Sequence, residues 1–461
     1  MSVVATQVNG ETVQAIGAEA QVLYGVEASW GTAPAAASRT LRLVAGETID
    51  QNVQVYQSKQ LRPDRMRNAP VRGSQDPGGN IPFELSPNGW NNFLYHLLLP
   101  TAVTTTGPTG GLLNATTAPT GVPATTGGTL ATASYYYKYT ATNAAGETLP
   151  SAASSVQSVT GPTGAVALTA TAVTSATGYN FYRATASGGP YYYAGSSATT
   201  AFTDTGAYTG GTLPVANTTG AVYTHVVKAG TVGTPLPIGF SLEKGFMDLG
   251  NVFELITGCK VDKMSINFKV DAIPSGTFDI VAQQFATSST SAFSNGSAGQ
   301  PSIPNEAPYT GAQIGIYSGT NALPVGAVTG TPLGLCNDLQ ITVSNQLFKK
   351  NGFILGSTLR QNLKPGTRMT DFTGKFIFQD LSLYNQAING TNTSLKVACI
   401  SGSYSHIFDI PTSQLVPSGS SPKIASDGPI EISLKGQSLP DVSTGTDIVL
   451  TIKTAEANIT N

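Results

Sequence analysis

Few side chains in this 461-residue sequence are of types that could bind a metal or catalyse a reaction. The three histidines, His96, His225 and His406, lie far apart and have no Cys or carboxylate at the spacing of metal ligands. We interpret each as a half-buried, hydrogen-bonded residue rather than a ligand or a base. The sequence therefore predicts no metal site and no cofactor.

The cysteines and the catalytic motifs support the same interpretation. Cys259, Cys336 and Cys399 are odd in number and widely spaced, which predicts reduced, buried thiols rather than a disulfide framework. No Gly-x-Ser-x-Gly elbow or Gly-x-Gly-x-x-Gly motif occurs, and Gly374 and Lys375 lack the rest of a phosphate loop. Carboxylates from distant loops can still meet, but the scarcity of Asp and Glu argues against a glycosidase. We expect a non-enzymatic protein, with a catalytic site of scattered residues as an alternative.

Two basic runs are the strongest charged features. The first contains Lys59, Arg62, Arg65, Arg67 and Arg72. The second contains Lys349, Lys350, Arg360, Lys364 and Arg368. The first lacks the interleaved aromatic residues that would stack on bases, which argues against nucleic-acid binding. The two runs are either solvated loops, the commoner case, or loops that dock on acidic residues of a neighbouring subunit, which we favour.

The composition predicts a mainly β protein with a surface suited to packing against other subunits. Charged residues make up 11% of the chain, against about 25% in ordinary soluble domains. The abundance of Thr, Ser, Val, Ala and Gly favours strands joined by many turns. A net charge of −2 argues against a protein that grips phosphates.

Neither secretion nor membrane insertion is expected. The beginning, MSVVATQVNGETV, has no basic stretch followed by an apolar core. The longest apolar run, Phe93 to Leu99, is too short to cross a bilayer. These features predict synthesis in the cytoplasm.

A change in composition marks an inserted domain at residues 106–222. This stretch holds ten of the eighteen tyrosines but only four charged residues, and Gly/Thr/Pro runs bracket it. Within it, SYYYKYTATNAAGETLPS predicts a strand, a turn and a second strand. Together with GYNFYRAT at Gly178 to Thr185, this pattern resembles a fibronectin type III or Ig-like module. The resemblance implies a small β-sandwich.

The segments around the insert, 1–105 and 223–285, are expected to form one domain. The sequence SPNGWNNFLYHLLL predicts a helix with Ser86 as its N-cap and Pro87 in its first turn. Its apolar stripe, interpreted as core, consists of Trp90, Phe93, Leu94, Leu97 and Leu98.

Four segments of this domain recur in the same order in residues 310–461. AQVLYG is echoed by AQIGIYSG, TLRLVAGETIDQN by GLCNDLQITVSNQ, GGNIPFEL by TGKFIFQD, and GTFDIVA by GPIEISL. For the three segments before the insert the offset is near 290–300 residues, and the preserved order indicates a tandem duplication. A second, shorter helix is predicted at LSLYNQAI, and residues 286–309 are predicted to be a crossover linker ordered only on assembly.

The flanking sequence resembles the phage tail tube family. The resemblance rests on ETIDQNVQVYQSKQLRPDRMRNAPVRGSQDPGGNIPFELSPNGWNNFLYHLL, on FSLEKGFMDLGNVFELITGCKVDKMSINFKVD, and on VSNQLFKKNGF with LRQNLKPGTRMTDFTGKFIFQD. It implies β-sandwich or barrel domains with a flanking helix, assembled into rings whose sheets join into an inner barrel. It also implies a virion structural protein of a long-tailed, siphovirus-like phage, assembled in the host cytoplasm. The inserted module would decorate the outside.

The resemblance also implies partners. Rings would stack into a tube for genome ejection, contacting tail terminator, tape measure and distal tail proteins. Because a tube ring of this family resembles six domains joined edge to edge, two domains per chain predict a trimer with pseudo-six-fold symmetry. A hexamer is the alternative if the duplication is illusory. The basic runs would then dock on the next ring.

DNA would pass through the lumen without specific binding, so the inner face should be small, polar or acidic. The candidates for this face are Asp271, Asp279, Asp427 and Glu431. The alternative to a tube protein is a surface adhesin or carbohydrate-binding β protein, with the tyrosine-rich insert as its binding face.

Overall fold

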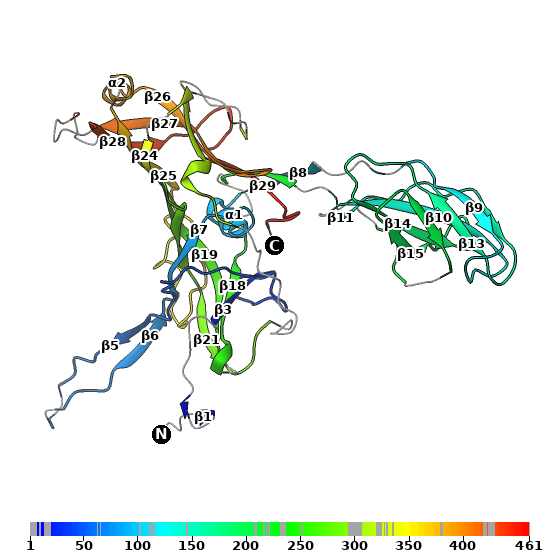
Figure 1. Cartoon of the computed structure of the whole chain (residues 1–461). Coiled ribbons are helices and arrows are strands. Elements are labelled where there is room, and N and C mark those ends of the chain that lie inside the picture. Colours follow the sequence, from blue (N-terminus) through cyan, green and yellow to red (C-terminus); the bar gives the residue numbers. More distant parts are fainter. Residues whose placement is uncertain are drawn as a thin grey trace. The chain divides into compact units, whose positions relative to one another are not determined.

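The structure, a computed structural model, divides the chain into two compact units (Figure 1). It describes residues 7–8, 11–12, 20–61, 63–64, 66–100, 103–109, 114, 116–143, 146–206, 210–214, 217, 219, 222–230, 237–249, 252–293, 307–319, 325–326, 328, 331–333, 336–378, 381–417, 422 and 429–460. Unit 1 comprises Met1–Thr104 and His225–Asn461, and unit 2 comprises Thr105–Thr224. The bounds expected for the insert were 106 and 222.

In unit 1, a first set of antiparallel strands pairs in the order β3, β18, β19, β20, β7. Their bounds are Ala20–Val26, Phe240–Phe246, Val252–Lys269, Ser275–Val281 and Gly78–Glu84, in that order. Two strands extend the set: β4 (Arg39–Thr40) pairs with β3, and β21 (Gln284–Ser288) pairs with the first part of β19.

A second set pairs in the order β22, β26, β27, β28, β25. Their bounds are Ile314–Gly319, Asn392–Ser401, Tyr404–Pro417, Glu431–Ser438 and Met369–Ile377, in that order. Here too, β23 (Thr331–Pro332) extends the first strand and β29 (Val449–Thr454) pairs with the first part of the long strand β27.

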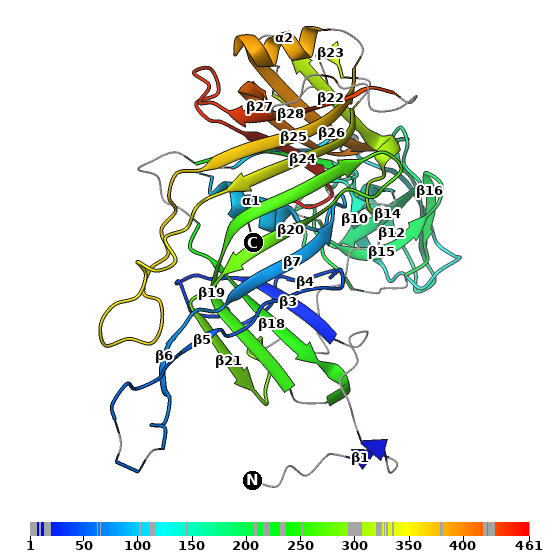
Figure 2. The same ribbon diagram turned by 90° about the vertical axis from the view of Figure 1, so that its left-hand side faces the viewer.

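Strand β24 (Cys336–Ser344) joins the two sets, because it pairs with β25 on one side and with β19 on the other. The result is a continuous sheet in the order β7, β20, β19, β24, β25, β28, which we call the long sheet (Figure 2). The remaining elements of unit 1 or its border are β1 (Gln7–Val8), β2 (Glu11–Thr12), β5 (Val53–Tyr56), β6 (Val71–Gln75), β8 (Val103–Thr109), β17 (Val222–Lys228) and the 3-10 turns Met247–Leu249 and Gly311–Gln313.

The core of unit 1 follows from alternation along the strands. In β19, Met264, Ile266 and Phe268 are buried while the residues between them are partly exposed, so one face of the long sheet is apolar and the other polar. On the apolar face, the rings of Phe83 and Phe278 stack with centroids 4.3 Å apart. Each such buried aromatic stabilises the fold by about 1.5–3 kcal/mol.

Helix α1 (Asn91–Leu98) covers this core, and its predicted apolar stripe is buried as expected. The predicted start was wrong, because Trp90 occupies the N-cap and Ser86 lies before a turn. Helix α2 (Ser382–Asn389) forms where the second helix was predicted. Both helices have eight residues, so the second is not shorter. In the described part of the chain, no helix has the length and hydrophobicity needed to span a bilayer.

The expected crossover is partly ordered. Strand β21 runs to Ser288, and Phe293 is 1% exposed, packed with Leu23 and Ala37. The buried carboxylate of Glu243 accepts a hydrogen bond from the Ser291 hydroxyl, which fixes this segment. Residues 294–306 lie outside the described residues.

Unit 2 contains two antiparallel sheets. One has the order β11, β10, β14, β15 with β12 on β10, and the other has the order β16, β13, β9. From β9 to β16 the bounds are Thr120–Ala124, Ala133–Asn143, Gly146–Glu147, Gln157–Val159, Ala165–Thr169, Gly178–Ala184, Tyr192–Ser197 and Ala201–Asp204. Tyr137, Tyr139 and Phe181 are fully buried in a core of this unit's own residues. The buried Asp204 is satisfied by the Tyr137 hydroxyl and the Arg183 guanidinium, each at 2.9 Å.

Candidate assembly surfaces

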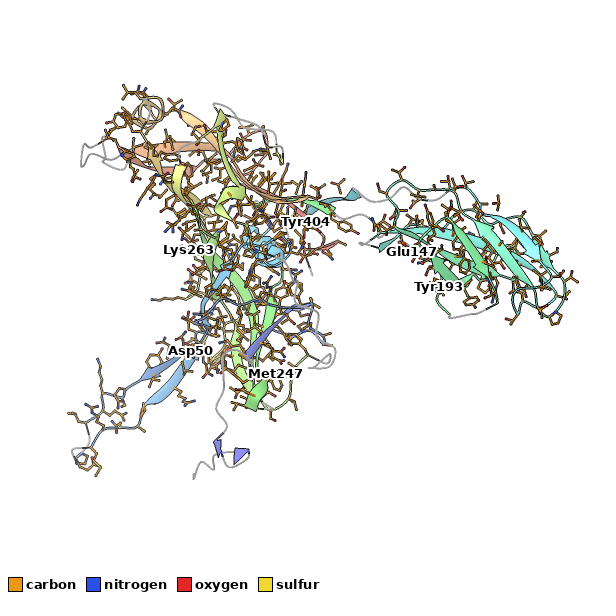
Figure 3. The ribbon with its side chains drawn as sticks, viewed as in Figure 1. Asp50, Glu147, Tyr193, Met247, Lys263 and Tyr404 are labelled. Carbon is orange, nitrogen blue, oxygen red and sulfur yellow. The ribbon has the colours of Figure 1, made fainter. Side chains whose placement is uncertain are left out.

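Two segments of unit 1, which we call arms, extend beyond the ends of strands of the long sheet. The first arm is the hairpin of β5 and β6 with its connection, residues 57–70, and the second arm is residues 345–368, between β24 and β25. Figure 2 shows them leaving the same edge of the unit. Asp50, labelled in Figure 3, lies at the base of the first arm, where it pairs with Gly78 of β7.

Strand pairing and side-chain amides hold the first arm together. Val55 pairs with Arg72 in the ladder, and beyond it the Gln57 amide donates to the Asn68 carbonyl at 2.6 Å. The arm is nevertheless rich in exposed apolar side chains. These are Val55, Tyr56, Leu61, Met66 and Val71, at 59, 60, 99, 67 and 61% exposure. Apolar side chains gathered in this way on a projecting hairpin mark a surface for contact with another protein.

The basic residues of the first arm sit among these apolar side chains. Lys59, Arg67 and Arg72 are exposed. Arg62 and Arg65 lie outside the described residues. The sequence pattern detected the charge of this arm but missed its apolar character, which the five exposed side chains supply.

The second arm also has an exposed apolar end. Leu355 is fully exposed, and Ile354 and Phe348 are 58 and 52% exposed. Lys350 and Lys364, from the predicted basic set, are exposed beside them. The other three members of that set have partners within unit 1.

Arg360 is the most buried of these three, with 0% of its side chain exposed. Its guanidinium forms an ion pair with Asp76, donates to the Ala282 and Lys349 carbonyls, and lies 4.7 Å from the Phe353 ring centroid. This side chain therefore joins the two arms to the sheet and is not available to another molecule.

Lys349 and Arg368 have acidic partners in the chain as well. The Lys349 ammonium lies 2.8 Å from Asp262, and Arg368 pairs with Asp447 and donates to the Gly230 carbonyl at 2.9 Å. Lys349 remains 46% exposed, so its contact is an open surface pair. Of the five predicted basic residues of the second arm, three thus pair with acids of the same chain, and Lys350 and Lys364 are exposed.

The polar face of the long sheet carries lysines interleaved with acids. Lys269 lies 3.9 Å from Asp338 on β24, and Lys263, labelled in Figure 3, is opposite Asp279 in the ladder. The charged residues of this face are Glu84, Lys263, Lys269, Asp279, Asp338, Asp371, Lys375, Glu431 and Lys435. Alternating signs largely cancel the field above the sheet.

Two of the four predicted lumen residues lie on this face. Burial raises the pKa of Asp279, although nearby Lys263 and Lys349 oppose the shift. Glu431 begins β28 and accepts a hydrogen bond from the Asn337 amide at 3.1 Å. Asp271 lies in the turn after β19, with φ of 54°, and Asp427 is outside the described residues.

The histidines have structural partners and are fully buried, so the expectation of half-burial was wrong. His96 lies 3.0 Å from the Tyr24 hydroxyl, and His406 contacts the Tyr309 hydroxyl and the Asn91 amide oxygen. Burial lowers the pKa of His96 and of His406 to about 3. The described residues contain no group of three or more His, Cys, Asp or Glu side chains able to hold a metal ion.

The two strand sets are also joined through helix α1. At its C-terminal end, the buried Asn345 amide donates to the Leu97 carbonyl at 2.7 Å and to the Val261 carbonyl at 3.1 Å. At its N-terminal end, Asn91 donates to the Glu456 carboxylate at 3.0 Å and accepts from His406. Residues that follow β24 and β29 therefore contact both ends of the helix that covers the first set.

Apolar arms, a charge-balanced sheet face and a two-part β framework are features of a protein that assembles with others. A search of curated proteins found no match. A model of the phage tail tube protein family, by contrast, matches residues 17–438, nearly the whole sequence. The chain therefore belongs to the phage tail tube protein family.

Proposed function

We propose that this chain forms stacked trimeric rings with pseudo-six-fold symmetry, which make the tail tube of a long-tailed, siphovirus-like phage. Family membership makes it a structural protein of the virion tail that assembles into a tube with itself and other tail proteins. The ring size in this proposal derives from an internal duplication of the tube domain, and the conduit would carry the genome into the host.

The order of strands supports the duplication. The path β3, β18, β19, β20, β7 has a counterpart in β22, β26, β27, β28, β25, strand for strand. In each set a short strand extends the first member and an eight-residue helix follows the last. We call the first set with α1 and the first arm half one, and the second set with β24, α2 and the second arm half two.

Individual residues match at a constant separation. Asn52 and Gln346, 294 residues apart, have φ of 46° and 47°, a conformation that side chains other than glycine rarely adopt. Leu61 and Leu355, also 294 residues apart, are the fully exposed ends of the two arms. Equal spacing of a backbone feature and a surface feature is what a duplicated domain would give.

The pairing of β19 with β24 carries the proposal. It runs from Lys263 opposite Ser344 to Lys269 opposite Asp338, and it joins equivalent halves edge to edge within one chain. Because the contact is head-to-tail, the same contact between chains would continue the row, and a row of this kind closes into a ring when its rotation divides a full turn. Six halves in such a ring require three chains.

The face of the long sheet suits a conduit for DNA. Lys269 pairs with Asp338 and Lys263 lies opposite Asp279, so on this face acids accompany cations that would otherwise retain phosphates. We propose that this face lines the lumen, with Asp279 and Glu431 on it. Unit 2 would be an inserted fibronectin type III or Ig-like module on the outside, since it has its own core.

Native mass spectrometry of isolated rings tests the ring size. A mass of three times the 47.5 kDa chain is expected. A mass of six chains would mean that each chain fills one position and that the duplication does not set the ring. Stable monomers that bind glycans would instead favour the adhesin alternative.

A further inference from the structure

The two helices occupy equivalent places in the halves but differ in exposure. Leu97 in the last turn of α1 is 1% exposed, whereas Ile388 in the last turn of α2 is 54% exposed. Leu381, directly before α2, is 55% exposed as well. Both views place α1 in the middle of unit 1 and α2 at one end (Figures 1 and 2). An apolar helix face covered in one half is thus open in the other.

A residue of half two caps the C-terminal end of α1. Asn345, 1% exposed, follows β24 directly and donates to the Leu97 carbonyl in the last turn of the helix. It reaches this carbonyl because β24 is paired along β19, the strand on which α1 lies. Residues 336–345 therefore pair with β19 and also cap the C-terminal end of α1.

Half one contains the corresponding segment. At the separation of 294 residues that relates Asn52 to Gln346, Asn345 corresponds to Gln51 and β24 corresponds to residues 42–50. This segment pairs with β7 near Asp50, as β24 pairs with β25. Residues 43–47 belong to no strand, and Leu43 is 37% exposed. Residues 42–50 therefore have one neighbouring strand, β7, whereas their counterpart β24 has two, β25 and β19.

We propose that residues 42–51 of a second copy of this chain dock beside α2 and the end of β27, with Gln51 in the role that Asn345 has within the chain. The inference rests on the proposed ring, and it assigns the surfaces that join one chain to the next. The occupant is a second copy because the surface and the segment that fits it repeat a contact already made inside each chain. Each chain would use one surface for the preceding copy and a different surface for the next, so the contact is head-to-tail.

The variant Ile388→Asp tests the helix face. A carboxylate at this exposed position leaves folding unchanged but cannot be buried without a partner. We expect ring formation to be lost and the thermal unfolding midpoint to be kept. The matched control is Val442→Asp, at a site that is 100% exposed, which should form normal rings. Rings of unchanged mass and abundance from Ile388→Asp would overturn the inference.

A cross-link identifies the partner segment. In a Cys336→Ser background, which removes the one native thiol that is not fully buried, Gln51→Cys is combined with Ile388→Cys and treated with a short thiol-reactive cross-linker. This double variant should give covalent dimers and trimers in denaturing gels, whereas each single variant should give monomers. Wild-type rings without any cross-link in the double variant would overturn this contact and leave the ring proposal intact. Wild-type protein that forms no rings or tubes at all would overturn both proposals.

Discussion

Arg360 of the second arm and Asp76 at the base of the first arm form an ion pair across 284 residues of sequence. The guanidinium is fully buried, while the Asp76 side chain is 42% exposed. Next to it, the backbone N–H of Gln75 donates to the Thr358 carbonyl at 2.9 Å. Together these contacts hold the two arms in a fixed relation, so that both apolar ends would meet the next ring at once.

Asp76→Asn should destabilise the protein by about 3 kcal/mol, because it leaves the buried Arg360 cation without a counter-charge. The free energy of unfolding in urea measures the loss. Asp64→Asn, which changes an exposed acid in the first arm, is the control and should alter stability by less than about 0.5 kcal/mol. Equal stability of both variants would show that the carbonyl contacts of Arg360 suffice.

Stacking of rings should depend on the apolar ends of the arms. Leu61→Asp with Leu355→Asp removes two fully exposed leucines and should leave ring mass unchanged while preventing tubes. Electron microscopy and sedimentation measure this directly. Tubes of normal length from the double variant would exclude the arm ends from stacking.

The basic residues of the first arm provide a second test of stacking, to be compared with the leucine variant. Arg67→Glu with Arg72→Glu should weaken stacking. High salt should weaken wild-type stacking as well, because salt screens exposed charges beyond about 8–10 Å. Stacking that survives high salt but fails in the leucine variant would assign the contact to the apolar side chains.

Deletion of residues 106–222, with a short Gly/Ser bridge, should leave assembly intact. Unit 2 has its own core around Tyr137, Tyr139 and Phe181, so its removal takes no packing residue from the core of unit 1. The expected result is tubes of smaller outer diameter in electron micrographs. Failure of the shortened chain to fold would show that unit 1 depends on the insert.

Acid should destabilise unit 1 through its buried histidines. The pKa of His96 and of His406 lies near 3 in the folded chain, below the ordinary 6.5, so the unfolded chain binds more protons between these values. The contribution of these two histidines to stability is therefore fully present above pH 6.5 and is lost as the pH falls towards 3. Buried Glu27 and Asp409, whose pKa values burial raises, act in the opposite direction.

His406→Asn should flatten this acid dependence as well as lower stability at neutral pH. Thermal unfolding midpoints from pH 7 to pH 4 measure the slope, and a residue with packing alone to contribute would lower the curve without changing its slope. Cys399→Ser is a control for burial, since Cys399 is equally buried in the neighbouring strand and does not titrate in this range. An unchanged slope in His406→Asn would contradict the assignment.

Local pattern predicted the elements of the fold, and long-range pairing decided the rest. The stripe from Trp90 to Leu98 indicated a buried helix because its period is visible in one segment. The burial of Arg360 could not be predicted from the sequence, because its partner Asp76 is distant in sequence. Lys350 and Lys364 belong to the same basic run but are exposed, so the pattern did not distinguish Arg360 from them. The same reason explains the histidines: the partners of His406 are Tyr309, before the Gly311–Gln313 turn, and Asn91 of α1, both distant in sequence.

The neutrality of the long sheet gives the last prediction. Asp279→Lys with Glu431→Lys adds cations to a face where Lys263 and Lys269 have acidic neighbours. Tubes of this variant should retain double-stranded DNA at low salt and release it as salt rises, because each phosphate contact releases counterions. Retention of a fluorescent duplex after gel filtration is the measurement. Asp279→Asn with Glu431→Gln, which removes the acids without adding cations, should retain far less. If the lysine variant retains no more DNA than wild-type tubes, this face does not line the lumen.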